Sequence, residues 1–201
     1  METTLTPIVV YAEQTPNPAA LKFVVNKPLL EGGVQLEFPS PEYCKGAPLA
    51  QKLFEFPFVK NIFISSNYVS ITKINEIEWS DVMNELRDFL KNYFTNNGVV
   101  LNELPKITDN PATLHQSIVK SITVEEIDLR IVDVLNEYIK PAVEQDGGAI
   151  TFKGFKDGVV TVALQGSCSG CPSSQMTLKA GIEGLLKRLI PEVESVRAEE
   201  V

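Results

Sequence analysis

The feature that most constrains the fold is a break in the hydrophobic pattern in the middle of the chain. From Asn96 to about Ile122 the periodicity of apolar residues fades, and the segments NNG, ELPK and TDNPAT supply turn and helix-breaking residues. The 201 residues are therefore predicted to form two small domains joined by a tether. We place an N-terminal domain at residues 1–97, a flexible linker at 98–122 and a C-terminal domain at 123–201.

Short β-rich runs alternate with helical runs in the N-terminal domain. Strands are predicted at Ile8–Tyr11 and Leu21–Val25, and two more, VKNIFIS and NYVSITKI, flank a tight turn at Ser66-Asn67. One helix follows Pro48, and a longer one is predicted over WSDVMNELRDFLKNYF with Ser80 as its cap. The apolar stripe of that helix is Val82, Leu86, Phe89 and Leu90. The pattern predicts a small α+β domain with its helices on one sheet face, and none of its residues is typical of a catalytic site.

The C-terminal domain is predicted to have the element order α-β-β-α-β. Thr123 stands three residues before Glu126, which is typical of a capping box at a helix start. An apolar face then runs down to Gln145, and Pro141 inside it predicts a kink or break near Tyr138. The residues of this face are Ile127, Ile131, Val134, Leu135 and Tyr138. The two domains together give an α+β fold class.

An antiparallel hairpin is expected after this helix, with AITFKGF and VVTVALQ joined by Lys156-Asp157-Gly158. In the second strand large apolar residues alternate with smaller or polar ones, so only one face is expected to need covering. A helix from Pro172 to about Ile190 and a short strand in VESVRAEE complete the domain.

Composition and charge exclude several classes of protein. The formal net charge is -8 and no run of basic residues occurs, so we expect no nucleic-acid partner and no membrane partner. The N-terminal residues lack the pattern of a secretory signal or a mitochondrial presequence, and we expect a cytoplasmic protein. Three cysteines are few and odd in number, which favours thiols or metal ligands over structural disulfides.

Two of the three cysteines, Cys168 and Cys171, lie in the stretch GSCSGCPSS. Pro172 favours a helix start directly after them, where free N–H groups and the helix dipole are expected to favour thiolate over thiol. Gly166 and Gly170 let the backbone come close to whatever the sulfurs hold. A pair of buried thiols, a redox dithiol and a metal site remain open at this point.

The number of ligands separates the metal sites from one another. A tetrahedral zinc site or a [4Fe-4S] cluster takes four ligands, and this domain offers two cysteines and no histidine. A twofold-symmetric dimer would supply four thiolates at its interface. The rivals are a thiol-disulfide oxidoreductase and a zinc-stapled dimer. Thioredoxin-like sites place CxxC in a βαβ pattern, whereas an antiparallel hairpin precedes it here, so iron-sulfur binding is favoured.

The sequence from VEQDGGAITF to IPEVESV resembles the C-terminal domain of the NifU and Nfu-type iron-sulfur cluster scaffold proteins, with GSCSGCPSS and QDGG as its most specific motifs. Residues 11–95 resemble the N-terminal domain of the Nfu proteins through TPNPAALKF, APLAQKLFEF and VKNIFISSNYVSITK. The resemblance implies that Cys168 and Cys171 bind a labile [4Fe-4S] cluster that bridges a homodimer. It implies a carrier that receives its cluster from an upstream donor, delivers it to client apoproteins and is not an enzyme.

Several other residues are weighed against plain structural roles. Cys44 is interpreted as an incidental thiol, because no ligand of the family is expected in that segment. His115 is interpreted as a solvated linker residue. Asp146-Gly147-Gly148 could orient the cysteines, but a helix stop explains the glycines more simply. Gly181 and Gly184 inside the last helix are expected at a close packing contact, for example between subunits.

Overall fold

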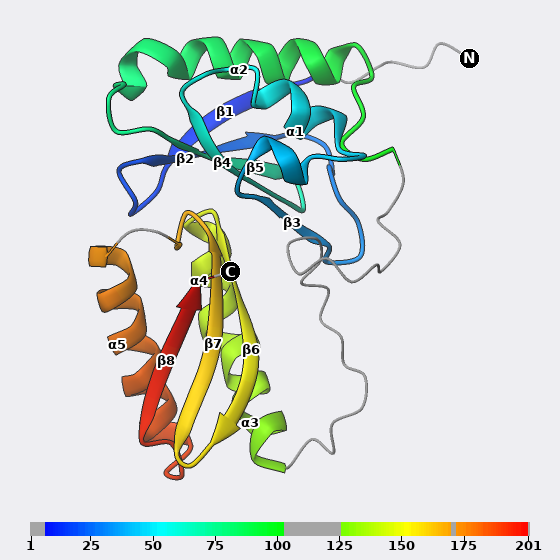
Figure 1. The fold of residues 1–201 in the computed structure, drawn as a ribbon. Helices are drawn as coiled ribbons and strands as arrows, with labels where there is room; N and C mark the ends of the chain where they lie inside the picture. The colour runs from blue at the N-terminus through cyan, green and yellow to red at the C-terminus, as the bar shows by residue number, and fades with distance from the viewer. Residues whose placement is uncertain (1–6, 103–125, 170–171, 201) are drawn as a thin grey trace.

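The structure is a computed structural model that describes residues 7–102, 126–169 and 172–200 (Figure 1). It has two domains of mixed α+β structure, each with its own sheet and its own hydrophobic core, as predicted. Residues 103–122 of the expected linker and the expected helix cap at Thr123 lie outside the described residues.

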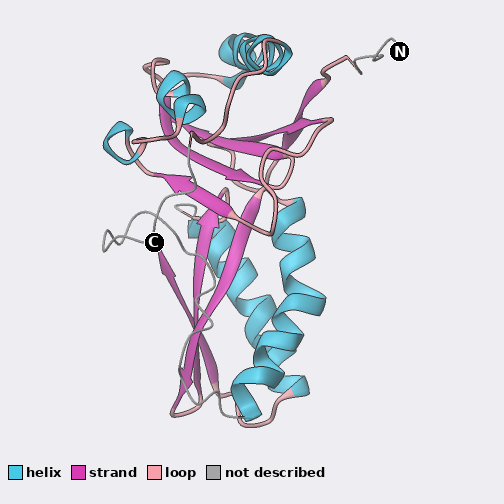
Figure 2. Cartoon of the chain, turned by 90° about the vertical axis from the view of Figure 1, so that its right-hand side faces the viewer, coloured by secondary structure: helices cyan, strands magenta, loops and turns pink. Residues whose placement is uncertain are grey.

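The N-terminal domain is a five-stranded antiparallel sheet in the order β1-β2-β5-β4-β3. Its strands are β1 Val10–Gln14, β2 Ala20–Val25, β3 Gln35–Phe38, β4 Val59–Ser65 and β5 Tyr68–Lys73. Its helices are the 3-10 turn Pro41–Tyr43, α1 Pro48–Leu53 and α2 Trp79–Thr95. Figures 1 and 2 show α1 and α2 on the same face of this sheet.

The apolar stripe of α2 closes the core above the sheet. Val82, Leu86 and Leu90 are buried as predicted, because they recur on one side of the helix and face the sheet. Ser80 does not cap the helix. The helix begins at Trp79, so Glu78 is the cap position. The Ser80 hydroxyl donates to Asp81 Oδ1 at 3.1 Å instead.

The strands of this sheet largely follow the prediction. Ser66 has a φ of 44°, which closes the predicted hairpin between β4 and β5. Strand β1 starts at Val10 rather than Ile8, because its register is set by pairing with β2. Strand β3, Gln35–Phe38, was not predicted. It is a four-residue edge strand, too short to show a clear alternation.

The C-terminal domain follows the predicted order of elements. These are α3 Glu126–Val134, a π-helical turn Leu135–Ile139, α4 Lys140–Gln145, β6 Gly148–Lys156, β7 Val159–Gly166, α5 Pro172–Leu189 and β8 Ser195–Glu200. Strand β7 is central, antiparallel to β6 and parallel to β8. Asp157 and Gly158 both have positive φ and close the predicted hairpin. Figure 2 shows the helices together on one side of this sheet.

The predicted break in the first helix is a π-helical turn at Leu135–Ile139. Pro141 has no N–H to donate to the carbonyl four residues earlier, and its ring crowds that turn, so the regular α pattern gives way there. Ile131 and Leu135 are buried as predicted, but Tyr138 is 52% exposed. The wider turn rotates Tyr138 away from the predicted face.

The second face of the five-stranded sheet is covered by the C-terminal domain. In Figure 1 the end of β7 meets this sheet on the side away from α2, and β7 contacts both β4 and β5. Every residue of β2 is buried, which requires cover on both faces. The expectation that β7 needs cover on one face only is wrong at this end, where Ala163 and Gln165 are also buried. No helix among the described residues is long and apolar enough to cross a membrane.

Candidate functional site

Cys168 lies in the turn that follows β7 and precedes α5. We call residues 166–169 the cysteine loop. Gly170 and Cys171 lie outside the described residues, so the role expected for Cys171 stays a prediction. The loop stands at the end of the C-terminal domain that meets the N-terminal sheet (Figure 1).

Backbone hydrogen bonds fold the cysteine loop into a tight turn. Gly166 has a φ of 67°, which a residue with a side chain rarely adopts. The N–H of Ser169 donates to the Gly166 carbonyl at 3.1 Å, and the Ser169 hydroxyl donates to the same oxygen at 2.8 Å. The N–H of Ser167 donates to the Gly147 carbonyl at 3.3 Å, which ties the loop to the end of α4.

The two glycines of the QDGG motif have different roles at this site. Gly147 has a φ of 79° directly after α4, so the predicted helix stop is confirmed. Gly148 makes room for the thiol, since a Cβ there would lie 2.7 Å from Cys168 Sγ and 2.7 Å from the Gln165 carbonyl oxygen. The motif therefore shapes the cysteine loop as well as ending the helix.

The Cys168 thiol is buried and protonated at neutral pH. The residue is 6% exposed and belongs to the C-terminal core with Ile131 and Leu135. Burial raises the pKa of Cys168 to about 11; the nearby Ser167 hydroxyl lowers it and the charge of Asp146 raises it. The expectation that the helix start favours thiolate is wrong for Cys168 here, because desolvation by burial is the largest effect on its pKa.

The N-terminal domain holds the cysteine loop directly. Asn17 Nδ2 donates to the Ser167 carbonyl at 3.1 Å and to the Ser169 carbonyl at 3.5 Å. The N–H of Gly166 donates to Glu37 Oε1 at 3.3 Å. These partners are 129 or more positions apart in the sequence, so the two domains build the loop environment together.

Two hydroxyls of β5 hold Gly147 and Gly148, which we call the glycine turn. Tyr68 donates to the Gly148 carbonyl at 3.2 Å and Ser70 donates to the Gly147 carbonyl at 2.6 Å. Gly147 is constrained by this contact, because a Cβ there would lie 2.6 Å from Ser70 Oγ. The glycine turn therefore fits against β5 only without a side chain.

Lys22 adds a charged contact at the same place. Its Nζ donates to the Gln145 carbonyl at 3.1 Å, pairs with Glu13 at 3.2 Å and lies 4.8 Å from the centre of the Tyr68 ring. The cation stands at the C-terminal end of α4, where the helix dipole favours positive charge. The five residues that contact the C-terminal domain through hydrogen bonds are called the docking face: Asn17, Lys22, Glu37, Tyr68 and Ser70.

Sequence reasoning missed the docking face, although its pattern was present. Antiparallel pairing aligns five residues in one row across the five strands, in the order Glu13, Lys22, Ser70, Phe63 and Glu37. Paired residues point to the same side of a sheet, and this side is opposite the helices. Large apolar residues on it, Phe63 and Tyr68, were the signal that a second layer covers this face.

Glu37 is a carboxyl without a charged partner among its described contacts. Burial raises its pKa to about 7, while hydrogen bonds from the Asn61 amide, the Gly166 N–H and the Ser169 side chain lower it. Within the described part of the chain, its Oε2 has no hydrogen-bond partner, and neither do the buried Asn61 Oδ1 and Gln165 Oε1. The boundary between the domains therefore contains polar atoms whose bonding is incomplete, which lowers its stability.

The remaining sequence candidates lie away from the loop. Cys44 is 1% exposed in the N-terminal core, consistent with an incidental thiol. His115 lies outside the described residues. Gly181 and Gly184 face open space on α5, so the close packing expected for them is not present within the described part of the chain. No group of three or more histidine, cysteine, aspartate or glutamate residues suited to a metal ion occurs among the described residues.

Comparison with known proteins gives a consistent result for both domains. Residues 10–97 match the family described as scaffold protein Nfu/NifU N terminal, and residues 131–197 match the NifU-like domain. The chain is 36% identical to the human protein named NFU1 iron-sulfur cluster scaffold homolog, mitochondrial, over 93% of this chain and 70% of the human one. It is 35% identical to the protein of that name from Drosophila sechellia, over 93% of this chain and 63% of that protein.

A solution NMR structure of a NifU-like protein from Saccharomyces cerevisiae is 21% identical with a TM-score of 0.43, and the match covers 51% of this chain and 92% of that one. The sequence identity to the human relative, together with the two family matches in the expected order, settles the classification. The chain belongs to the Nfu family of iron-sulfur cluster scaffold proteins, with an N-terminal Nfu domain and a C-terminal NifU-like domain.

Proposed function

We propose that the chain is a carrier that binds a labile [4Fe-4S] cluster through Cys168 and Cys171 and delivers it to client apoproteins. One observation carries the proposal. Cys168 lies in the turn between β7 and α5, where the absence of a side chain on Gly148 leaves room for its sulfur. A thiol that served only as core filling would not need a glycine at a position where a Cβ would lie 2.7 Å from its sulfur atom.

The cluster is proposed to bridge two copies of the chain. The CxxC motif of each chain offers two thiols, whereas a [4Fe-4S] cluster takes four thiolate ligands. The described residues contain no additional cluster of ligands that would complete the set within one chain. A homodimer with the loops facing each other supplies the four, and a cluster at such an interface is held by few bonds and is readily passed on.

The second candidate is a thiol-disulfide oxidoreductase that uses the same CxxC. An attacking thiol in such enzymes has a lowered pKa, and the pKa of Cys168 is raised to about 11 by burial. Cys168 is therefore a poor nucleophile in this conformation. A cluster also requires thiolate ligands, so this pKa does not separate the two candidates; membership of the Nfu family favours the carrier.

The partners of the carrier are an upstream cluster donor and client apoproteins. The described residues of the N-terminal domain include no ligand set, so recognition of partners is its proposed use, together with the docking described above. A cytoplasmic location stays a prediction from the sequence, while the human and Drosophila relatives are named as mitochondrial. Cell fractionation decides between the two compartments.

Anaerobic reconstitution tests the proposal. The full chain is incubated with iron and sulfide, and iron content, sulfide content and the absorption spectrum are measured. The carrier predicts about four irons per two chains and a broad charge-transfer band in the visible region. A protein that binds no iron under these conditions but reduces a disulfide substrate would support the oxidoreductase instead.

A further inference from the structure

Among the described residues, six hydrogen bonds of the docking face end on backbone groups near Cys168, and Glu37 also accepts from the Ser169 side chain. Asn17, Tyr68 and Ser70 donate to carbonyls of the cysteine loop and the glycine turn, and Lys22 donates to the end of α4. Glu37 accepts from the loop itself. The docking face therefore fixes the path of the backbone on both sides of the thiol.

An apolar contact accompanies these hydrogen bonds. Val24, Phe63 and Tyr68 of the sheet form a buried cluster with Ala149 of β6. Phe63 also lies against the loop, since a Cβ on Gly166 would be 2.9 Å from its ring. The cluster is small and the boundary contains unpaired polar oxygens, so the contact is weaker than a domain core. The two domains share one chain, which favours the contact through a high effective concentration.

We propose that the docking face is a binding surface for the cysteine loop of its own chain, and that this closed form controls access to Cys168. While the domains are docked, the loop keeps the conformation that buries the thiol in the C-terminal core. Release of the loop from Asn17, Tyr68 and Ser70 lets Cys168 turn toward solvent. The closed form is the resting state, and opening precedes any chemistry at the sulfur.

The closed form also excludes a second copy of the chain. The N-terminal sheet covers the end of the C-terminal domain at which the cysteine loop lies (Figure 1). A second loop that approaches this end meets the sheet first. This part of the inference rests on the proposed function, because it matters only if two loops must face each other around a cluster.

The test measures the reactivity of Cys168 in the full chain without iron. The protein is treated with iodoacetamide at pH 8, and alkylation of each cysteine is followed by peptide mass spectrometry. The test variant combines Tyr68→Phe with Ser70→Ala and removes both hydroxyl donors to the glycine turn. Cys44, buried in the N-terminal core, serves as the internal measure of unfolding.

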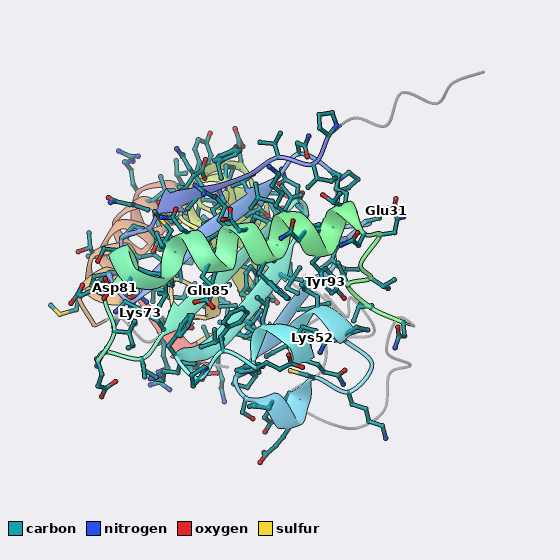
Figure 3. All side chains as sticks on the ribbon, turned by 90° about the horizontal axis from the view of Figure 1, so that it is seen from above. Glu31, Lys52, Lys73, Asp81, Glu85 and Tyr93 are labelled. Atoms are coloured by element: carbon teal, nitrogen blue, oxygen red, sulfur yellow. The ribbon has the colours of Figure 1, made fainter. Side chains whose placement is uncertain are left out.

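A matched control removes two hydroxyls elsewhere in the same domain. Tyr93 donates to the Val99 carbonyl and Thr95 to the Lys91 carbonyl, both at 2.7 Å. Tyr93 and Thr95 both belong to α2, which lies on the sheet face opposite the cysteine loop, and Figure 3 shows Tyr93 from that side. The control variant combines Tyr93→Phe with Thr95→Ala.

The expected result is a ratio of Cys168 to Cys44 alkylation rates that rises about tenfold or more in the docking variant, since two hydrogen bonds that hold the closed form are lost. The control variant keeps the ratio of the unchanged protein within about twofold. An equal ratio in all three proteins overturns the proposal. No iron is present, so failure of cluster binding in a separate experiment would leave this result unchanged.

Discussion

Cys44 and Cys168 are both buried thiols, and burial raises the pKa of each to about 11. Their surroundings differ. Cys44 sits among the apolar residues of one core, and a Cβ on the nearby Gly46 would meet open space. Cys168 sits in a turn with a glycine against its sulfur and side chains of another domain on its backbone. Burial therefore arises in one case from core packing with a hydrogen bond from the thiol to the Ser40 carbonyl, and in the other from a loop held by two domains.

Replacement of single cysteines by serine tests this difference between Cys44 and Cys168 most directly. We expect Cys168→Ser and Cys171→Ser each to abolish cluster binding, because a serine oxygen is a poor ligand for iron in a cluster of thiolates. Cys44→Ser is expected to bind a full cluster. Iron and sulfide analysis after anaerobic reconstitution measures the difference. If the Cys44→Ser protein binds no cluster, the ligands have been assigned to the wrong thiols.

Dimerisation of the chain is expected to depend on Cys168 and Cys171 and not on Cys44. The reconstituted protein should be a dimer, and removal of iron with a chelator should shift it to monomer, because the shared ligands are then lost. Light scattering reports the mass before and after the chelator. Cys44→Ser is the control and should behave identically. A monomer that carries a complete four-iron cluster would rule out the bridging arrangement.

The glycines beside the two cysteines sharpen the comparison. Gly148→Ala is expected to cost about 2–3 kcal/mol of folding free energy, since the new methyl group meets Cys168 Sγ and a backbone oxygen. Gly46→Ala is expected to cost only about 1 kcal/mol, because its φ of 80° is strained but its surroundings are open. Urea unfolding measures both values. Equal losses would show that the space around Cys168 is not restricted.

The pH dependence of folding stability is expected to depend on Glu37, a buried carboxyl that contacts the cysteine loop. The pKa of Glu37 is about 7 in the folded chain, above its usual 4.5. The stabilisation from this group is therefore full below pH 4.5 and is lost as pH rises through 7. Between pH 5.5 and 8 the loss is expected to be of the order of 1–2 kcal/mol.

Glu37→Gln removes the titrating carboxyl and keeps the shape of the side chain. Unfolding in urea at pH 5.5 and pH 8 should show a smaller difference in the variant than in the unchanged protein. Other titrating groups contribute equally to both proteins and cancel in this comparison. The same pH dependence in both proteins would place Glu37 in contact with solvent.

Most of the fold could be predicted because it rests on local signals. The hairpin turns at Ser66 and Asp157, the stripe of α2 and the break before Pro141 are all encoded within a few residues. The errors occur where local signals are weak or misleading. Strand β3 is short and lies at an edge, and the π-helical turn displaces Tyr138 by widening the helix.

The candidate site was only half visible in the sequence. The CxxC, its glycines and the helix start are contiguous, so Cys168 could be placed without a structure. The docking face could not, because Asn17 and Ser167 are 150 positions apart and meet only through tertiary packing. The same packing overturns the expected ionisation of Cys168, since burial depends on residues that the local sequence does not name.

The docking contacts also bear on how freely this protein can vary among species. Six hydrogen bonds between the domains in the described part of the chain end on backbone groups of the C-terminal domain and do not select its side chains, whereas Glu37 also accepts from the Ser169 side chain. Substitutions at Ser167 or Ser169 leave the six backbone bonds possible, whereas a side chain at Gly147 or Gly166 would collide with the sheet. A NifU-like domain of different sequence that keeps these two glycines should therefore seat on the same face. Sequence drift in the loop and preservation of the docked arrangement are compatible.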